Sequence, residues 1–201
     1  MLTVFVAACL SADPVALFDG RTLDGWACHT DGVFRVEDGA IVAGDPDEPA
    51  PRNEFLCTSD EFGDFELRLQ FRIADGPKSN AGVQFRTARI PGSHEVSGYQ
   101  ADIGPGWFGA LYDESRRRRT LAKPDEATVE KALAAAGGDG WHTYRIRAVG
   151  PRITLWLNGV QTVDYTERDA DVAGTGVIAL QIHGGMTGLV EYRDIKLTPV
   201  E

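Results

Sequence analysis

Polar side chains that could do chemistry recur at a two-residue spacing in three separate stretches of the chain. The pairs are Gln84 with Arg86, Gln100 with Asp102, and Gln181 with His183. Successive side chains of an extended strand point to opposite faces, so each pair shares one face and the apolar residues between them share the other. Amides, a carboxylate and an imidazole can hold a polar ligand by directed hydrogen bonds. The spacing therefore predicts a polar sheet face that binds sugar and could act on it.

Three of these groups can do more than bind. A carboxylate or an imidazole can transfer a proton, and a fixed guanidinium can stabilise negative charge that develops during a reaction. We predict that Arg86, Asp102 and His183 meet in one groove. Two alternatives stay open, because His183 could instead cap a strand end before Gly184, and Arg86 could form a structural ion pair with Asp102.

Further side chains around this face are expected to contact the ligand. They are Asn80, Gln84, Gln100 and Gln181 on the strands, and Trp107, Tyr112 and Glu114 in the segment that follows. The amides would orient hydroxyl groups, and an indole ring can stack on a sugar ring. Trp107 lies in a glycine-rich loop between Gly104 and Gly109, so packing within that loop is the alternative for it.

The remaining chain is patterned as strands that would carry this face. Phe65–Ile73 alternates apolar and polar residues throughout, as expected of an antiparallel strand with one face in the core. Asn158-Gly159 separates two further strands, since both central residues of a type I′ turn need positive φ. One helix is expected over residues 127–136, between Pro124 and the pair Gly137-Gly138. We therefore predict an all-β sandwich or jelly roll with one short surface helix.

Length and charge restrict the function classes. The 201 residues suit one domain, which we place at residues 15–201. A net charge of −10 argues against a nucleic-acid or anionic-membrane partner. Arg116–Arg119 is a local basic run, expected to be a solvated loop rather than an anion site. Beyond the N-terminus no stretch approaches the roughly 20 apolar residues of a membrane span.

Residues 1–14 have the character of an export segment. Met1–Leu10 is apolar, and Val6–Cys9 resembles a bacterial lipobox, in which the cysteine is lipidated after cleavage. We expect an exported protein, whether periplasmic, secreted or an outer-membrane lipoprotein, with Cys9 as its lipid anchor. A disordered or edge-strand N-terminus is the alternative.

The other cysteines, Cys28 and Cys57, form an even pair that could bridge in an oxidising compartment. Their spacing alone does not show that the two Cα atoms are close enough. No cluster of His and Cys has ligand spacing, so neither a metal nor another cofactor is predicted. Calcium beside the Asp-Gly turns is unsupported by the loop spacing.

Several motifs occur in the order typical of one family. They are Leu17–Gly20 with Leu23–Trp26, Gly63–Leu67, Asn80–Arg86, Leu157–Gly159, Leu180–Gly184 and Tyr192–Ile195. Over nearly its whole length the chain resembles the 3-keto-disaccharide hydrolase family. The resemblance implies a concanavalin A-like jelly roll of two antiparallel sheets, and an oligosaccharide or 3-keto-glycoside as substrate. In many members one strand carries Tyr-Glu-x-Gln, whereas Tyr99–Asp102 exchanges the acid and the amide.

The resemblance also implies a reaction, the hydrolase- or lyase-type cleavage of 3-keto-glycosides. A ketone at C3 acidifies the proton on C2, so a base can form an enolate, the glycosidic oxygen leaves C1, and water adds back. The usual pair of glycosidase carboxylates is then not required. We assign Arg86 to the enolate oxygen. Either Asp102 or His183 would take the C2 proton, while the other assists the leaving group.

A non-catalytic carbohydrate-binding module on the same sandwich is the second hypothesis, because fold alone does not determine function. The carboxylate, imidazole and guanidinium favour catalysis, since binding modules can manage with amides and aromatic rings. A retaining glucanase is disfavoured, because the chain contains no Glu-x-Asp-x-x-Glu pattern.

Overall fold

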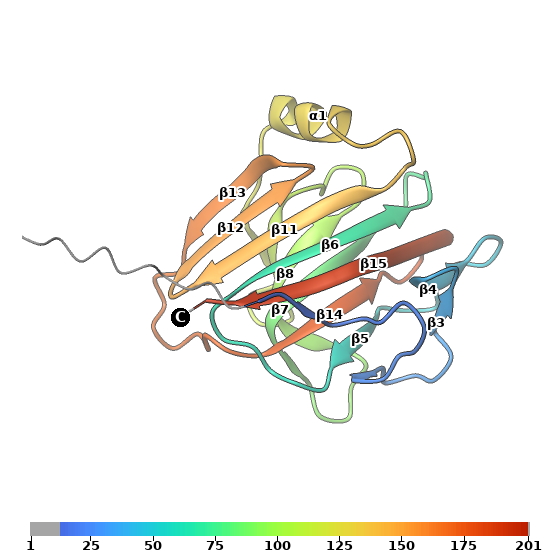
Figure 1. Cartoon of the computed structure of the whole chain (residues 1–201), viewed down its shortest axis with the longest axis horizontal. Coiled ribbons are helices and arrows are strands. Elements are labelled where there is room, and N and C mark those ends of the chain that lie inside the picture. The colour runs from blue at the N-terminus through green and yellow to red at the C-terminus, as the bar shows by residue number, and fades with distance from the viewer. Residues whose placement is uncertain (1–12, 201) are drawn as a thin grey trace, which may run out of the picture.

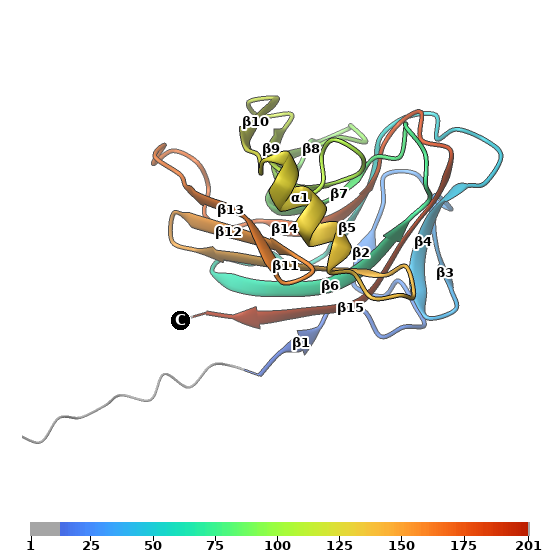
Figure 2. The ribbon, with the colours of Figure 1, turned by 90° about the horizontal axis from the view of Figure 1, so that it is seen from above.

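The computed structural model of the protein describes residues 13–200. This part of the chain forms two antiparallel sheets that pack face to face and appear as two layers in Figure 2. Sheet A, in front in Figure 1, has the order β13 (Val160–Thr166), β12 (Arg152–Leu157), β11 (His142–Val149), β6 (Phe65–Ile73), β15 (Gly188–Pro199), β4 (Ala40–Asp45) and β3 (Phe34–Glu37), with β1 (Val15–Ala16) also paired to β15. Sheet B has the order β10 (Arg119–Ala122), β9 (Leu111–Glu114), β8 (Val96–Ile103), β7 (Ala81–Arg89), β14 (Val177–Ile182), β5 (Glu54–Thr58) and β2 (Trp26–Ala27). The predicted all-β jelly-roll sandwich is confirmed.

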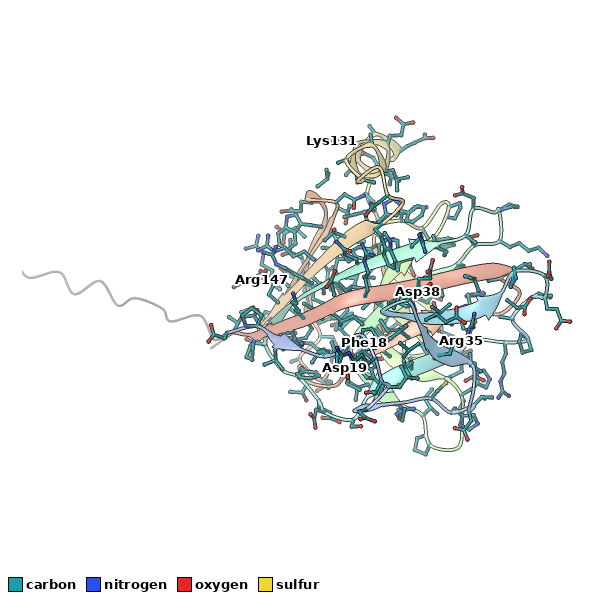
Figure 3. All side chains as sticks on the ribbon, turned by 45° about the vertical axis from the view of Figure 1, so that its right-hand side comes forward. Phe18, Asp19, Arg35, Asp38, Lys131 and Arg147 are labelled. Carbon is teal, nitrogen blue, oxygen red and sulfur yellow. The ribbon has the colours of Figure 1, made fainter. Side chains whose placement is uncertain are left out.

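The core between the sheets follows from side-chain alternation. In β6, Phe65, Leu67 and Leu69 are buried, whereas Glu66 points outward. Arg147 of β11 pairs in register with Glu66 and lies on the same outer face of sheet A (Figure 3). Burying apolar surface is worth roughly 25 cal/mol per Å². The free energy of this burial decides which side of each regular strand faces the core. In sheet B, the polar residues that alternate with buried apolar ones therefore point away from the core.

One helix, α1 (Glu126–Ala134), lies beside β13 at the top of Figure 1 within the described residues. Asp125 caps its N-terminus, because its carboxylate accepts a hydrogen bond from the Thr128 backbone N–H at 2.8 Å. Asn158 Nδ2 donates to the Ala132 carbonyl at 2.9 Å, which ties the helix to the β12–β13 turn. The predicted short surface helix is confirmed.

A β-bulge in β7 redirects the chain at the centre of sheet B. Arg86 and Thr87 of β7 stand opposite the single residue Gly98 of β8, and Arg86 has a φ of 45°. A Cβ on Gly98 would lie 2.3 Å from Thr87 Oγ1, so the close approach of the two strands requires glycine. Bulges bend the strand that carries them and re-aim its side chains. On the far side of the bulge in β7, Val96 of β8 packs with Phe55 of β5 on the outer face of sheet B.

The two cysteines of the described residues are free. Cys28 packs against the main core, whereas Cys57 belongs to the apolar cluster around Phe55 on the opposite face of sheet B. Cys28 Sγ donates to Glu54 Oε2 at 3.5 Å. The disulfide that the sequence left open is therefore absent from this part of the chain, because the two side chains leave the sheet in opposite directions.

The basic run differs from the expected solvated loop. Arg116 and Arg117 both pair with Asp113, which is fully buried, and Arg117 also pairs with Glu167 at 2.6 Å. A buried carboxylate is costly unless charged donors pair with it, and this requirement draws the two guanidinium groups inward.

The predicted lipidation site, Cys9, and almost all of the expected export segment lie outside the described residues. Among residues 13–200, no helix has the length and apolar character needed to cross a membrane.

Candidate functional site

The outer face of sheet B carries a chain of hydrogen-bonded amides that ends on a carboxylate. Gln84 Nε2 donates to Gln100 Oε1, and Gln100 Nε2 donates to Asp102 Oδ1 at 2.5 Å. Gly82 of β7 pairs with Asp102 of β8, and a Cβ on it would lie 2.6 Å from Gln100 Cδ. The glycine therefore makes room for the amide of Gln100, which in turn holds one oxygen of Asp102 and leaves the other oxygen free to act.

Several buried atoms on this face have no hydrogen-bond partner within residues 13–200. They include Gln84 Oε1, Asp102 Oδ2 and both amide atoms of Gln181. Gln84 and Gln181 are fully buried, and Asp102 is only 4% exposed. Because an unsatisfied buried polar group costs about 1–3 kcal/mol, such a cluster marks a place where a ligand or water completes the bonding.

Two tyrosines of sheet A hold the backbone under this face from across the core. Tyr144 Oη donates to the Asp102 carbonyl and accepts from the Gly109 N–H at 2.9 Å. Tyr192 Oη donates to the Gln181 carbonyl at 2.7 Å. Both rings are fully buried. The packing of the sandwich thus fixes the positions of Asp102 and Gln181 before any ligand arrives.

A pocket of about 210 Å³ lies on this face. It is lined by Asn53, Asn80, Gln100, Asp102, Trp107, Tyr112, Glu114 and His183. A second hollow of about 360 Å³ shares Asn80, Trp107 and His183 with it, so the two adjoin. At Asn53 the wall is reinforced by the bent β7–β8 hairpin, because Asn53 Nδ2 donates to Glu95 Oε1 at 3.3 Å.

The electrostatics of the pocket favour the neutral form of its carboxylates. Burial raises the pKa of Asp102 to about 7; the hydrogen bond from Gln100 and the charge of Lys123 oppose this rise, and the charge of Glu114 adds to it. The pKa of Glu114 is also raised, by burial and by the charge of Glu95. Asp102 can therefore exchange a proton near neutral pH, which an ordinary surface carboxylate cannot do.

The family comparison agrees with the motifs in the sequence. The model of the 3-keto-alpha-glucoside-1,2-lyase-like domain matches residues 13–198, which is nearly the whole chain. The chain belongs to this family. The resemblance to 3-keto-disaccharide hydrolases is thereby confirmed. No curated protein sequence matches the chain.

Solved structures share the fold of this lyase-like domain. A predicted glycosyl hydrolase from Parabacteroides distasonis is 15% identical with a TM-score of 0.67, over 94% of each chain. The carbohydrate-binding module CBM66 from Bacillus subtilis is 14% identical with a TM-score of 0.65, over 87% of this chain and 95% of that one. A beta-glucanase from Bacillus licheniformis is 8% identical with a TM-score of 0.60, over 95% of this chain and 99% of that one. At these identities the likeness establishes the jelly-roll fold alone.

The prediction that Arg86 shares the groove of this lyase-like domain is wrong. Its guanidinium is 4% exposed and donates to the Gly150 carbonyl at 2.7 Å, to the Gly63 carbonyl at 3.2 Å and to Asp64 Oδ1 at 2.6 Å. The cause is the bulge, which adds a residue to β7 and so reverses the side on which Arg86 leaves the sheet. The alternative pairing with Asp102 is also wrong, since Asp64 is the ionic partner.

The other predicted residues fall into two groups. Asn80, Gln100, Asp102, Trp107, Tyr112, Glu114 and His183 come together around the pocket. Gln84 and Gln181 lie on the same face but are buried beneath it, so they do not line the pocket. His183 Nδ1 contacts the Gly184 carbonyl at 2.8 Å, which occupies one ring nitrogen and leaves Nε2 for a ligand.

Three residues of the site carry no signal in the local sequence. Asn53 lies in a proline-rich segment; its Oδ1 accepts from the Gly184 N–H at 2.9 Å and it lines the pocket. Glu95 reaches the site through the bent hairpin, and Lys123 Nζ lies 5.3 Å from the centre of the Trp107 ring. Contacts between segments distant in the sequence bring each of these residues to the site.

The arrangement offers proton transfer, hydrogen bonding and ring stacking in one small volume. Trp107 is 40% exposed at the mouth, where an aromatic face can meet the apolar face of a sugar. Within residues 13–200, no group of three or more His, Cys, Asp or Glu side chains is placed to hold a metal ion.

Proposed function

We propose that this protein cleaves the glycosidic bond of 3-keto-glycosides, with Asp102 as the base that removes the C2 proton. The observation that carries the proposal is the buried carboxyl of Asp102, held through one oxygen by Gln100 and unpaired at the other. The family of 3-keto-alpha-glucoside-1,2-lyase-like domains supports the substrate class. The pocket and the adjoining hollow, of about 210 and 360 Å³, offer the space of a small-molecule site.

Asp102 suits this role because of where its proton affinity lies. A general base works best when its pKa is close to the working pH, and burial raises the pKa of Asp102 to about 7. A solvated carboxylate, with its low pKa, would be a weak base toward a carbon acid. The amide of Gln100 keeps the carboxyl in one orientation while Oδ2 takes the proton.

The reaction proceeds in three balanced steps. Asp102 removes the proton from C2, and the electron pair of the C–H bond moves into the ketone to form an enolate. The enolate then expels the glycosidic oxygen from C1, which leaves a C1–C2 double bond conjugated to the ketone. Water finally adds across that bond: its hydroxyl goes to C1, Asp102 returns the proton it took to C2, and the remaining proton of the water replaces the one that left with the alcohol.

The enolate oxygen needs hydrogen-bond donors other than Arg86. The side-chain amides of Asn53 and Asn80 line the pocket and can donate to it. Lys123 is the nearby cation, because its charge acts on Asp102 and its ammonium lies against the Trp107 ring. Donors already in place at the developing charge lower the barrier without reorganisation.

The leaving oxygen needs a proton as it departs. His183 lines both the pocket and the adjoining hollow, with one ring nitrogen occupied by the backbone and the other available. Glu114 is the second group that could supply the proton, because burial and the charge of Glu95 raise its pKa. We assign the role to His183, since it borders both spaces whereas Glu114 borders only the pocket.

A carbohydrate-binding module remains the second candidate function. The exposed ring of Trp107 and the amides around it would serve such a module equally well. A module, however, gains nothing from burying an unpaired carboxyl, which costs stability at neutral pH. Asp102 therefore favours the enzyme.

The test is release of a chromogenic alcohol from 3-keto-glucosides of both anomeric forms. We expect the wild type to release it and Asp102→Asn to lose about 100-fold or more in kcat/KM, the scale of a lost general base. His183→Ala should be slowed more for poor leaving groups than for good ones. Asp164→Asn, an exposed residue of β13, is the matched control and should retain full activity.

Equal rates in the wild type and Asp102→Asn would remove Asp102 from the mechanism. Binding of the keto-sugar without any release would favour the carbohydrate-binding module.

A further inference from the structure

A groove crosses the end of the sandwich between two connections. Residues 74–80 join β6 to β7, and residues 183–187 join β14 to β15. A backbone hydrogen bond links the two connections at one end, from the His183 N–H to the Asn80 carbonyl at 3.2 Å, and at the other end the Ala74 N–H donates to the carbonyl of Leu189 in β15 at 2.8 Å. Between these two links the connections diverge and leave open space.

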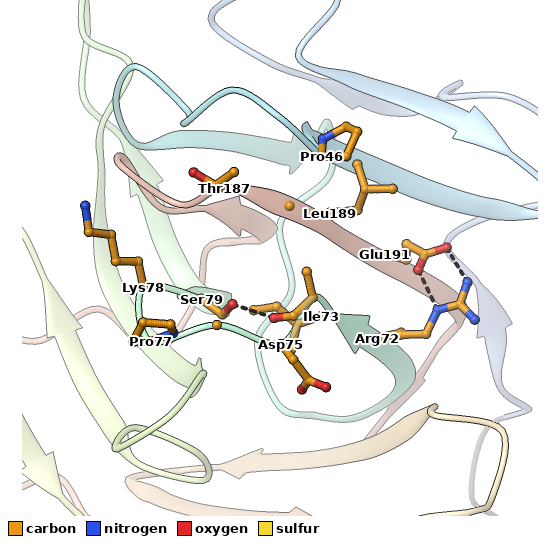
Figure 4. A pocket seen from close by; sticks show the side chains of 13 residues that line it. Pro46, Arg72, Ile73, Asp75, Pro77, Lys78, Ser79, Thr187, Leu189 and Glu191 are labelled. Carbon is orange, nitrogen blue, oxygen red and sulfur yellow. Dashed lines mark hydrogen bonds and ion pairs between the residues drawn. The ribbon is translucent and has the colours of Figure 1, made fainter.

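This space adjoins the proposed catalytic pocket. The inner hollow, of about 360 Å³, shares Asn80 and His183 with that pocket. The outer hollow, of about 660 Å³, shares residues 77–79 with the inner one (Figure 4). The pocket and the two hollows are therefore neighbours in a row that begins at Asp102 and passes His183.

The outer hollow is lined mainly by apolar groups. Pro46 and Leu189 lie along one wall, and Ile73 and Pro77 lie along the other (Figure 4). The charged pair at its far end is already satisfied, because the Arg72 guanidinium donates to both carboxylate oxygens of Glu191, at 2.5 and 2.8 Å. Asp75, Lys78, Ser79 and Thr187 also line the hollow, and apolar groups make up most of the surface between these polar side chains.

The opposite direction is blocked. At Asn53 the bent β7–β8 hairpin covers the outer face of sheet B, where Glu95 bonds to Asn53 and Val96 packs with Phe55. A substituent on C1 of a sugar held at Asp102 therefore has its open route past His183 and not under the hairpin.

We propose that the groove is the subsite for the leaving group, and that it takes a large and mainly apolar aglycone, such as an aryl-substituted alcohol. The assignment of the groove to a leaving group rests on the proposed glycoside cleavage. The two hollows together are large enough for a group of several rings. The preference for large aglycones would come from the apolar surface that they bury in the groove, at roughly 25 cal/mol per Å².

The experiment compares two 3-keto-glucosides whose leaving groups are primary alcohols of similar acidity, ethanol and 2-(biphenyl-4-yl)ethanol. We expect the wild type to favour the biphenyl substrate by about tenfold or more in kcat/KM, because the added rings bury apolar surface. Thr187 is exposed on the groove wall, so Thr187→Trp fills the space and should bring the ratio of the two kcat/KM values close to one. Thr166→Trp, at an exposed position of β13, should keep the wild-type ratio.

Binding of the corresponding unoxidised glucosides, measured by calorimetry, separates this inference from the proposed reaction. If neither keto-substrate is cleaved, the proposed function fails. The groove is then supported only if the biphenyl glucoside binds more tightly than the ethyl glucoside and Thr187→Trp removes the difference. Equal kcat/KM or equal affinity for the two aglycones in the wild type would overturn the inference, as would a ratio unchanged in Thr187→Trp.

Discussion

Replacing Asp102 by Asn should stabilise the protein at high pH while it abolishes the proposed reaction. Burial raises the pKa of Asp102 from 3.8 to about 7. The folded state therefore holds this proton more tightly than the unfolded state does. By linkage, the stability that this tighter proton binding contributes is fully present at low pH. It declines as the pH rises above the pKa of the unfolded state, and it is lost above the pKa of the folded state.

The size of the effect follows from the two pKa values. A gap of about 3 pKa units, at about 1.4 kcal/mol each, corresponds to about 4 kcal/mol of stability lost between low and high pH. Between about pH 5 and about pH 8 the loss should be roughly 2–3 kcal/mol. Asn cannot ionise, so the variant escapes this loss. Its amide leaves an unpaired donor that costs about 1–3 kcal/mol, but this cost does not vary with pH and cancels in the comparison.

Thermal unfolding at the two pH values measures the difference. In a domain of this size each kcal/mol moves Tm by about 2–4 °C, so Asp102→Asn should gain roughly 5–10 °C on the wild type as the pH rises from about 5 to about 8. Asp164→Asn serves as the control. The pKa of Asp164 is lowered by its hydrogen bonds to Arg152, so this variant should show no such gain.

Parallel Tm curves for the wild type and Asp102→Asn across this pH range would refute the reasoning. They would mean that Asp102 is ionised at little cost in the folded protein and that its environment is wetter than the pocket geometry indicates.

Two further predictions separate structural from functional residues. Arg86→Met should cost about 2–4 kcal/mol of stability, because it leaves the Gly63 and Gly150 carbonyls without their buried donor, and urea unfolding measures this loss. Activity per folded molecule should stay within about tenfold of the wild type; the roughly 100-fold loss of an oxyanion donor would instead return Arg86 to the site. Trp107→Ala should weaken sugar binding about tenfold by calorimetry through loss of ring contact. Its midpoint of unfolding should be nearly unchanged, since Trp107 is partly exposed.

Alternation along the strands predicted which side chains share the outer face of sheet B wherever the strands are regular. Gln100 and Asp102 share a face because Ala101 and Ile103 between and beyond them enter the core. The same rule places His183 on the pocket side. Turn chemistry predicted the hairpins and the ends of α1 equally well, since each depends on residues close together in the sequence.

Arg86 shows where this reasoning stops. The bulge depends on Gly98, in a different strand, which admits Thr87 at a distance no Cβ would allow. One added residue reverses every later side chain relative to the expected face. Glu95 could not be foreseen for a related reason, since the bend that brings it to Asn53 follows from the pairing of β7 with β8. Asn53 itself is held by the Gly184 N–H, which is distant in the sequence.

The absence of a guanidinium beside Asp102 has a chemical consequence. A cation within a few ångström of a carboxylate lowers its pKa by favouring the charged form, so the predicted pair of Arg86 and Asp102 would have made a poor base. In the described structure the bulge directs Arg86 to Asp64, and the neutral amide of Gln100 is the group that bonds to the Asp102 side chain. Burial can then keep the pKa near 7. The irregularity that defeated the alternation rule therefore also keeps a guanidinium away from this carboxyl, because the side of the sheet that residue 86 occupies decides whether its charge reaches the pocket.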